Sequence, residues 1–174
     1  MTDDVILVDA QDNEIGSMPK LEAHQLGKLH RAFSVFIFNN NGELLLQQRA
    51  LDKYHSGGKW TNTCCSHPRI GEDTLQAAYR RLQEEMGMSC ELKYGFSFTY
   101  EAVVNEALSE NEFDHVFFGQ TDDLPLINPD EVADYRYITL EALETDIALY
   151  PQQYTEWLKI CFDKVLTYCE HQMI

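Results

Sequence analysis

The pattern of apolar and polar positions predicts strands throughout the first third of the chain. A short apolar run at 5–8, followed by polar turn residues, is typical of a small strand and turn. Two mainly apolar segments, 33–38 and 44–47, flank the pair Asn41-Gly42, which favours a β-hairpin. Residues 60–67 also have an extended pattern. Further strands are expected at 96–104, 113–119 and 134–138.

Three later segments have the spacing of helices. In residues 71–87, apolar side chains recur every three or four positions from Leu75 to Met86, and Gly87 is a natural terminator. Residues 140–147 and 154–172 are expected to be helical as well. Strands and helices do not alternate as βαβ units, so the pattern predicts an α+β fold. Without a repeat or a linker, residues 1–174 are expected to form a single domain.

Composition and charge narrow the possible partners. The net charge is −16, whereas non-specific binding to nucleic acid or an anionic membrane needs a basic surface. A small anionic substrate remains possible in a locally basic site. No apolar run approaches the ~20 residues of a membrane span, and the first residues lack the features of a signal peptide. Five irregularly spaced cysteines without a C-x-x-C pair indicate a reducing cytoplasm.

The stretch WTNTCCSHP contains the most unusual chemistry. In an extended chain, side chains alternate between two faces, so Cys65 and His67 share one face and Cys64 takes the other. The pattern therefore predicts that Cys65 faces a pocket and that Cys64 packs in the interior. The remaining cysteines are expected to be buried as small apolar residues; they are Cys90, Cys161 and Cys169.

Two carboxylates show the same alternation. Glu110 and Glu112 lie two positions apart and point the same way in extended chain, although a solvated loop end is the alternative for these residues alone. His24 and His30 need a turn between them to come together. With His67, three imidazoles and two carboxylates suit Zn²⁺ or Mn²⁺ better than Ca²⁺. No role is assigned to the other histidines, which are His55, His115 and His171.

The helix predicted at 71–87 resembles the Nudix box, G-x5-E-x7-R-E-U-x-E-E-x-G-U, where U is a bulky aliphatic residue. The matching positions are Glu72, Arg80, Leu82, Glu84, Glu85, Gly87 and Met88. Ser66 takes the place of the first glycine, and Arg81 takes that of the first glutamate of the R-E-U-x-E-E core. The carboxylates of such a helix hold Mg²⁺ against a diphosphate. Replacing one by a cation removes a metal ligand and adds a partner for phosphate, which suggests diphosphate binding without hydrolysis.

This altered box begins inside TNTCCSHP, with histidines upstream and Glu-Asn-Glu downstream. The combination is similar to type I isopentenyl-diphosphate isomerases, and the similarity covers nearly the whole chain. It implies a Nudix-like mixed sheet sandwiched by helices. It also implies reversible conversion of isopentenyl diphosphate to dimethylallyl diphosphate, with an isoprenoid diphosphate as the small-molecule partner and a monomer or weak homodimer as the assembly.

The resemblance implies a role for each matching residue. Cys65 and Glu112 match the catalytic pair. One divalent metal, Mn²⁺ or Zn²⁺, would be bound by His24, His30, His67, Glu110 and Glu112. The Mg²⁺ that accompanies the diphosphate would be bound by Glu85, with the Cys65 carbonyl nearby. The residues that match the family's diphosphate contacts are Lys20, Arg49, Lys53 and the backbone of Ser66. Arg81 is expected to contact the diphosphate as well. Tyr100 matches an aromatic ring beside the catalytic acid, and Trp157 matches the ring facing the hydrocarbon end.

The isomerisation requires residues of these kinds. Moving an unactivated double bond adds one proton, removes another and passes through a carbocation-like state, so an acid and a base must flank the substrate in a dry pocket. The sequence leaves open which residue gives the first proton. Two alternatives remain: a Nudix hydrolase of nucleoside diphosphate derivatives, which Arg81 disfavours, and a metal-binding module without enzymatic activity.

Overall fold

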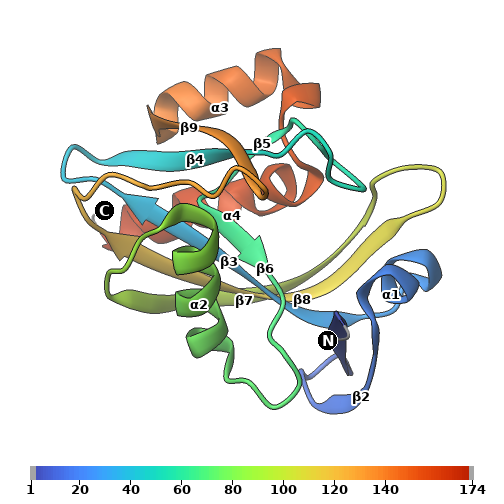
Figure 1. The fold of residues 1–174 in the computed structure, drawn as a ribbon. Coiled ribbons are helices and arrows are strands. Elements are labelled where there is room, and N and C mark those ends of the chain that lie inside the picture. Colours follow the sequence, from blue (N-terminus) through green and yellow to red (C-terminus); the bar gives the residue numbers. More distant parts are fainter. Residues whose placement is uncertain (1–2, 173–174) are drawn as a thin grey trace.

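The computed structural model describes residues 3–172, which form nine strands, four α-helices and one 3₁₀-helix (Figure 1). The strands are β1 (Asp4–Val8), β2 (Glu14–Pro19), β3 (His30–Phe38), β4 (Glu43–Arg49), β5 (Trp60–Thr61), β6 (Cys64–Ser66), β7 (Leu92–Val103), β8 (Ser109–Gln120) and β9 (Val132–Thr139). The helices are α1 (Lys20–Leu26), α2 (Thr74–Met86), α3 (Leu140–Leu149), the 3₁₀-helix η1 (Pro151–Gln153) and α4 (Glu156–Gln172).

Strand β3 is the centre of a mixed sheet. Along one side it pairs in parallel with β8, from His30 opposite Glu112 to Phe38 opposite Gln120. On its other side β3 pairs antiparallel with β6, where Ser34 lies opposite Cys65. Strand β7 extends the sheet beyond β8 in antiparallel register. Segments that lie far apart in the sequence are therefore neighbours along β3.

The turn of the predicted hairpin is present, but the pairing of its two strands does not continue beyond the turn. Gly42 has the left-handed φ of 76° that the turn requires, and its N–H donates to the Asn39 carbonyl at 3.1 Å. After the pair Phe38–Leu44, β3 and β4 share no further registered pair in the described part of the chain. Strand β4 pairs instead with β9. This separation opens space at the middle of β3 for the short strand β6.

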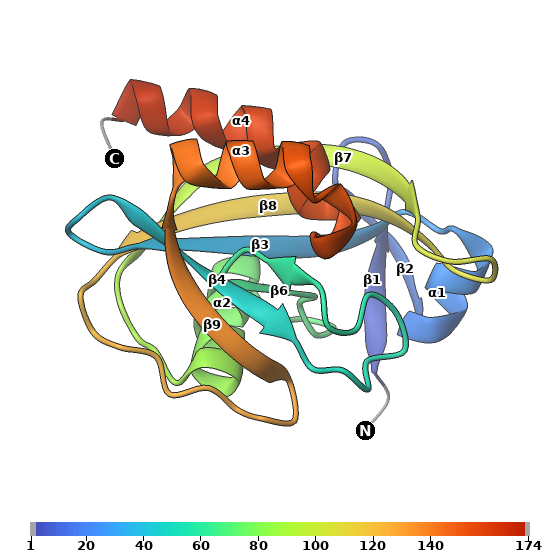
Figure 2. The same ribbon diagram turned by 90° about the horizontal axis from the view of Figure 1, so that it is seen from above.

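Helices cover both faces of the sheet. Helix α2 packs against one face, with Phe33 and Val35 of β3 in its core cluster. Helix α4 packs against the other face, with Phe36 and Phe38 in its cluster. This division follows from the alternation of side chains along a strand. Figure 2 shows α3 and α4 on one side of the sheet and α2 on the other. The predicted α+β fold, a mixed sheet between helices, is confirmed.

The predicted helices are found as α2, α3 and α4, but α1 was not predicted. Its segment is polar and lacks a clear apolar period. It ends at Gly27, whose left-handed φ of 64° reverses the chain between His24 and His30. Residues 60–67 are extended as expected, in the two short strands β5 and β6. Within residues 3–172, no helix has the length and apolar character needed to cross a membrane.

Candidate active site

A polar pocket of about 160 Å³ opens beside α1, between the sheet and the loop 50–59. It contains nearly every side chain that the sequence singled out. The predicted residues that line it are Lys20, His24, Arg49, Lys53, Cys65, Ser66, His67, Arg81, Glu85, Tyr100, Glu110, Glu112 and Trp157. His30 does not line the pocket; it is fully buried next to Glu112. The topology thus gathers residues from both halves of the chain into one site.

Three histidines and two glutamates form a compact cluster at the α1 end of this pocket. Glu110 and Glu112 point from one face of β8 and are only 3% and 6% exposed. His24 Nε2 lies 3.4 Å from Glu110 Oε2. His30 Nε2 and His67 Nε2 lie 3.4 Å and 3.2 Å from Glu112 Oε1. These are the five side chains that the sequence predicted to lie together, and the pairing of β3 with β8 places His30 opposite Glu112.

The cluster fits a divalent cation. One donor atom from each of His24, His30, His67 and Glu112 lies within 4.8 Å of the others. Within residues 3–172, Nε2 of His24, Nε2 of His30 and Oε2 of Glu110 are buried without a hydrogen-bond partner. Such orphaned atoms each cost about 1–3 kcal/mol. Imidazole and carboxylate donors together suit a transition metal or Zn²⁺.

The electrostatics of the cluster also favour a cation. Burial lowers the pKa of His24 to about 3, and it lowers that of His67 well below the usual range. Both rings are therefore neutral at physiological pH and have lone pairs available for a metal. His30 differs, because burial acts to lower its pKa but the contact with Glu112 raises it. Burial acts to raise the pKa of Glu112, but hydrogen bonds with Glu110 and His30 lower it to about 2. Burial and the charge of Glu112 raise the pKa of Glu110.

Cys65 lies on the pocket side of β6, as the alternation predicted, and its sulfur has polar neighbours. The thiol donates to Asn62 Oδ1 at 2.9 Å and accepts from Trp157 Nε1 at 3.2 Å. Ser34 Oγ lies 3.6 Å away and donates to Asp114 Oδ2 at 2.8 Å. Burial, and then the charge of Asp114, raise the pKa of the thiol. The group is therefore a protonated thiol at neutral pH.

Cys64 points to the opposite face. It is fully buried in the core cluster beneath α2. Its thiol donates to Glu85 Oε2 at 2.9 Å. Burial, and then the charge of Glu85, raise its pKa well above the usual value. Cys64 therefore contacts Glu85, which lines the pocket, but does not line the cavity itself.

The carboxylate of Glu112 faces the same cavity as the Cys65 thiol. Its Oε2 accepts a hydrogen bond of 2.9 Å from Tyr100 Oη, which comes from the neighbouring strand β7. Burial and the charge of Glu112 raise the pKa of Tyr100 well above its usual value, so the phenol remains a donor. One carboxylate oxygen thus faces histidines while the other is oriented by Tyr100.

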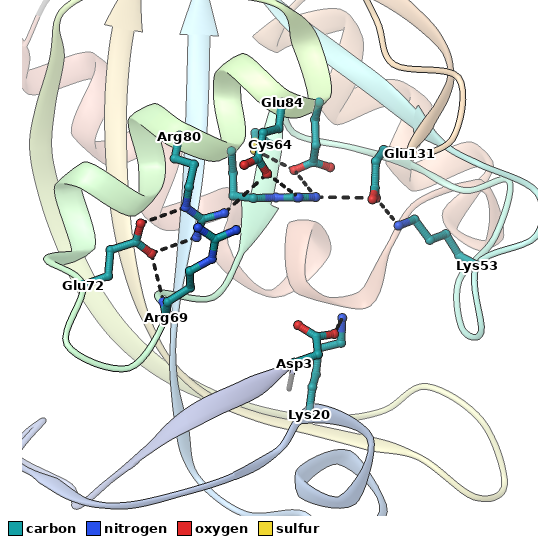
Figure 3. Close-up of polar contacts among 11 residues, drawn as sticks. Asp3, Lys20, Lys53, Cys64, Arg69, Glu72, Arg80, Glu84 and Glu131 are labelled. Atoms are coloured by element: carbon teal, nitrogen blue, oxygen red, sulfur yellow. Dashed lines mark hydrogen bonds and ion pairs between the residues drawn. The ribbon is translucent and has the colours of Figure 1, made fainter. Parts of the chain in front are cut away.

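Four cations also line the pocket; three of them pair with carboxylates, and the fourth lies over an aromatic ring. Lys20 Nζ lies 2.7 Å from Asp3 Oδ2, and Lys53 pairs with Glu131 (Figure 3). Arg81 contacts Glu84 at 2.8 Å, Glu85 at 3.4 Å and Glu131 at 3.5 Å. Arg49 lies over the Trp157 ring, 5.2 Å from its centroid. This local concentration of positive charge suits a diphosphate in an otherwise acidic protein.

The remaining positions of the Nudix-like helix have a structural explanation. Glu72 precedes α2 and accepts two hydrogen bonds of 2.8 Å from Arg80, which joins the loop to the helix (Figure 3). Glu84 pairs with Arg81 and is half exposed. Burial raises the pKa of Glu85, which lines the pocket. Arg81 therefore occupies, with its positive charge, a position where the Nudix pattern has a carboxylate.

Sequence reasoning missed several pocket residues. His55 was assigned no role, yet its Nε2 lies 3.0 Å from Glu110 Oε1. Tyr54, Ser34, Asp114 and Glu131 also line the cavity. Only Asp114 had a signal in the sequence, because it continues the alternation of Glu110 and Glu112. His115 points away and pairs with Asp12, and His171 is exposed on α4.

Comparison with known proteins identifies the relatives of this chain. Residues 28–158 match the family model of the NUDIX domain. Isopentenyl-diphosphate Delta-isomerase 2 of Aromatoleum aromaticum is 52% identical over 167 residues, covering 96% of this chain and 88% of that protein. The enzyme of the same name from Photorhabdus laumondii is 54% identical over 159 residues, covering 91% and 90%.

Solved structures show the same fold. DR0079 from Deinococcus radiodurans superposes with a TM-score of 0.71 at 21% identity, covering 84% of this chain and 89% of that one. A MutT NUDIX hydrolase from Burkholderia pseudomallei has a TM-score of 0.63 at 19% identity, covering 79% and 98%. From the sequence matches along nearly its whole length, the chain belongs to the isopentenyl-diphosphate Delta-isomerase family, within the wider NUDIX group.

Proposed function

We propose that this pocket catalyses the reversible conversion of isopentenyl diphosphate to dimethylallyl diphosphate, a step of isoprenoid biosynthesis. The relatives of the chain carry the name of this isomerase. The observation that carries the proposal is that the Cys65 thiol, the Glu112 carboxylate and the Trp157 ring all line one cavity. They supply two proton-transfer groups and an electron-rich surface.

The reaction adds a proton to the terminal alkene carbon and removes one from the methylene on the other side of the branched carbon. Cys65 and Glu112 are the proposed acid–base pair. The raised pKa of Cys65 keeps its sulfur protonated, and the low pKa of Glu112 keeps its carboxylate ionised. The two groups thus begin in complementary states. Tyr100 orients Glu112, and Trp157 stabilises positive charge on the branched carbon.

Two metal sites are part of the proposal. His24, His30, His67, Glu110 and Glu112 would hold one divalent ion, Mn²⁺ or Zn²⁺. Glu85, with the carbonyl of Cys65, would hold the Mg²⁺ that accompanies the diphosphate. The first ion supplies a positive charge that tunes and orients the Glu112 carboxyl when it is bound.

The diphosphate would be bound by the cations that line the pocket. The proposed contacts are Lys20, Arg49, Lys53, Arg81 and the backbone of Ser66. Their present partners, such as Asp3 and Glu131, are carboxylates that a diphosphate can replace. We further propose a single catalytic domain over residues 1–174, working in the cytoplasm as a monomer or weak homodimer. With its net charge of −16, it is not expected to bind nucleic acid or a membrane.

The test is to incubate the purified protein with isopentenyl diphosphate and divalent metal in D₂O. NMR should detect dimethylallyl diphosphate and deuterium in both isomers. Release of inorganic phosphate from nucleoside diphosphate derivatives, with no isomer formed, would instead support a hydrolase.

A further inference from the structure

Tyr54 and His55 lie directly outside the His/Glu cluster, on the loop 50–59 between β4 and β5. The loop is held tightly in place. Gly58 N–H donates to the Arg49 carbonyl at 3.0 Å, and Arg49 Nη2 donates to the His55 carbonyl at 3.2 Å. A Cβ on Gly57 would lie 2.6 Å from the Leu51 carbonyl oxygen, so the close approach of the loop to itself requires glycine. These contacts aim both side chains into the pocket.

Tyr54 contacts the side of His24 that faces away from the cluster. Its Oη lies 2.6 Å from His24 Nδ1, and the two rings are stacked with centroids 5.9 Å apart. Nε2 of His24 points toward Glu110 instead. When Nε2 uses its lone pair for a metal, Nδ1 carries the hydrogen and donates it to Tyr54 Oη. The phenol can accept this hydrogen, so its contact supports the tautomer and the ring orientation that coordination needs.

His55 makes the corresponding contact with Glu110. Its Nε2 is 3.0 Å from Glu110 Oε1, whereas Oε2 of the same carboxylate faces His24. His55 is only 7% exposed, so little water competes for this bond. Because His55 holds Oε1 of Glu110 in place, Oε2 of the same carboxylate points in a defined direction toward His24.

His55 is not the centre of a separate metal site. His24, His55 and Glu110 do lie within 4.8 Å of one another, as do His24, His30, His67 and Glu112. Both groups use His24, however, and its second nitrogen is already bonded to Tyr54. One Nε2 lone pair serves one cation, so the two groups are parts of one centre.

We propose that Tyr54 and His55 are positioning residues that orient His24 and Glu110 for metal binding without touching the metal. The inference rests on the metal centre of the proposed function. Outer contacts of this kind typically affect metal affinity by about 10–100-fold. In this chain, the loop 50–59 supplies both of them.

The test measures Zn²⁺ affinity by competition with a chromogenic chelator, and the imidazole ligands of the Zn²⁺-loaded protein by X-ray absorption. Tyr54→Phe and His55→Ala should each weaken affinity about 10–100-fold while the number of imidazole ligands stays unchanged. His55→Gln, which keeps an N–H donor, should recover part of the loss. Tyr94→Phe and His171→Ala, both exposed and remote, should match the wild type. Circular dichroism establishes that each variant is folded.

Unchanged affinity in Tyr54→Phe and His55→Ala would overturn the inference. So would the loss of one imidazole ligand in His55→Ala, because His55 would then bind the metal directly. Metal affinity is measured without substrate, so these outcomes are independent of the isomerase assay. A wild-type protein that isomerises its substrate while both variants bind Zn²⁺ normally would remove this inference alone.

Discussion

The indole N–H of Trp157 donates a hydrogen bond of 3.2 Å to the sulfur of Cys65, across 92 positions of sequence. The same indole ring lies under the guanidinium of Arg49. Trp157 was expected from the sequence to offer its ring to the hydrocarbon, but its nitrogen also orients the thiol. This residue therefore joins α4 to the strand that carries the proposed proton-transfer group.

Replacing the two neighbouring cysteines should have unequal effects. Cys65→Ser should reduce kcat by about 10²–10⁴-fold, the usual contribution of a proton-transfer group. Cys64→Ala should retain most of the activity, although losing a buried bond to Glu85 should lower the free energy of unfolding by about 1–2 kcal/mol. Steady-state kinetics and urea unfolding measure the two effects. Equal loss of activity in both variants would contradict the assignment of faces.

Glu112→Gln should lose both activity and metal. The amide cannot act as a base, and it is a poorer ligand beside His30 and His67. We expect kcat to fall by at least about 10²-fold, with less metal retained after dialysis, as measured by atomic emission. Glu101→Gln, at an exposed position on the adjacent strand β7, is the matched control. A Glu112→Gln protein with normal turnover would remove this residue from both roles.

Two substitutions of Trp157 can test its N–H group and its ring face separately. Trp157→Phe keeps an aromatic face but removes the N–H that bonds to Cys65, so kcat should fall modestly, by about 10-fold for ~1.4 kcal/mol. Trp157→Leu also removes the π face, which contributes about 2 kcal/mol to a desolvated cation, so its kcat should fall further. Identical kcat values for the two variants would show that the ring does not stabilise charge. Thermal unfolding controls for the packing of α4.

The pair Glu72–Arg80 should make stability depend on acid pH. The hydrogen bonds from Arg80 lower the pKa of Glu72 below its ordinary 4.5. Their contribution is therefore complete above pH 4.5 and is lost as pH falls through the lower folded-state pKa. Glu72→Gln should cost about 1 kcal/mol at pH 7, and the cost should shrink below that window. Urea unfolding at several pH values, with exposed Glu144→Gln on α3 as control, tests this; a cost that stays constant down to low pH would contradict it.

Local patterns predicted α2 well because its apolar spacing and the terminating Gly87 agree. They did not predict the parallel pairing of β3 with β8. Residues 32–38 of β3 are buried throughout, so their hydrophobicity does not indicate which strand lies alongside. For the same reason the separation of β3 from β4 after Phe38 was not foreseen.

The lining of the pocket was predictable where alternation or resemblance identified residues, as for Cys65 and Glu112. Tyr54 and His55 had neither signal. Their direction depends on how a polar loop folds against Leu51 around Gly57, and the pattern of a loop does not specify which side chains turn inward.

The pairing of β3 with β8 also has a consequence for biosynthesis of the protein. A nascent chain that has left the ribosome only as far as α2 already contains His24, His30 and Cys65, yet β3 still lacks the strand along its long edge. Such an edge invites pairing with other chains until its own partner arrives. The proposed acid–base pair is therefore complete only after β8 has been made, and Trp157 on α4 joins it later still.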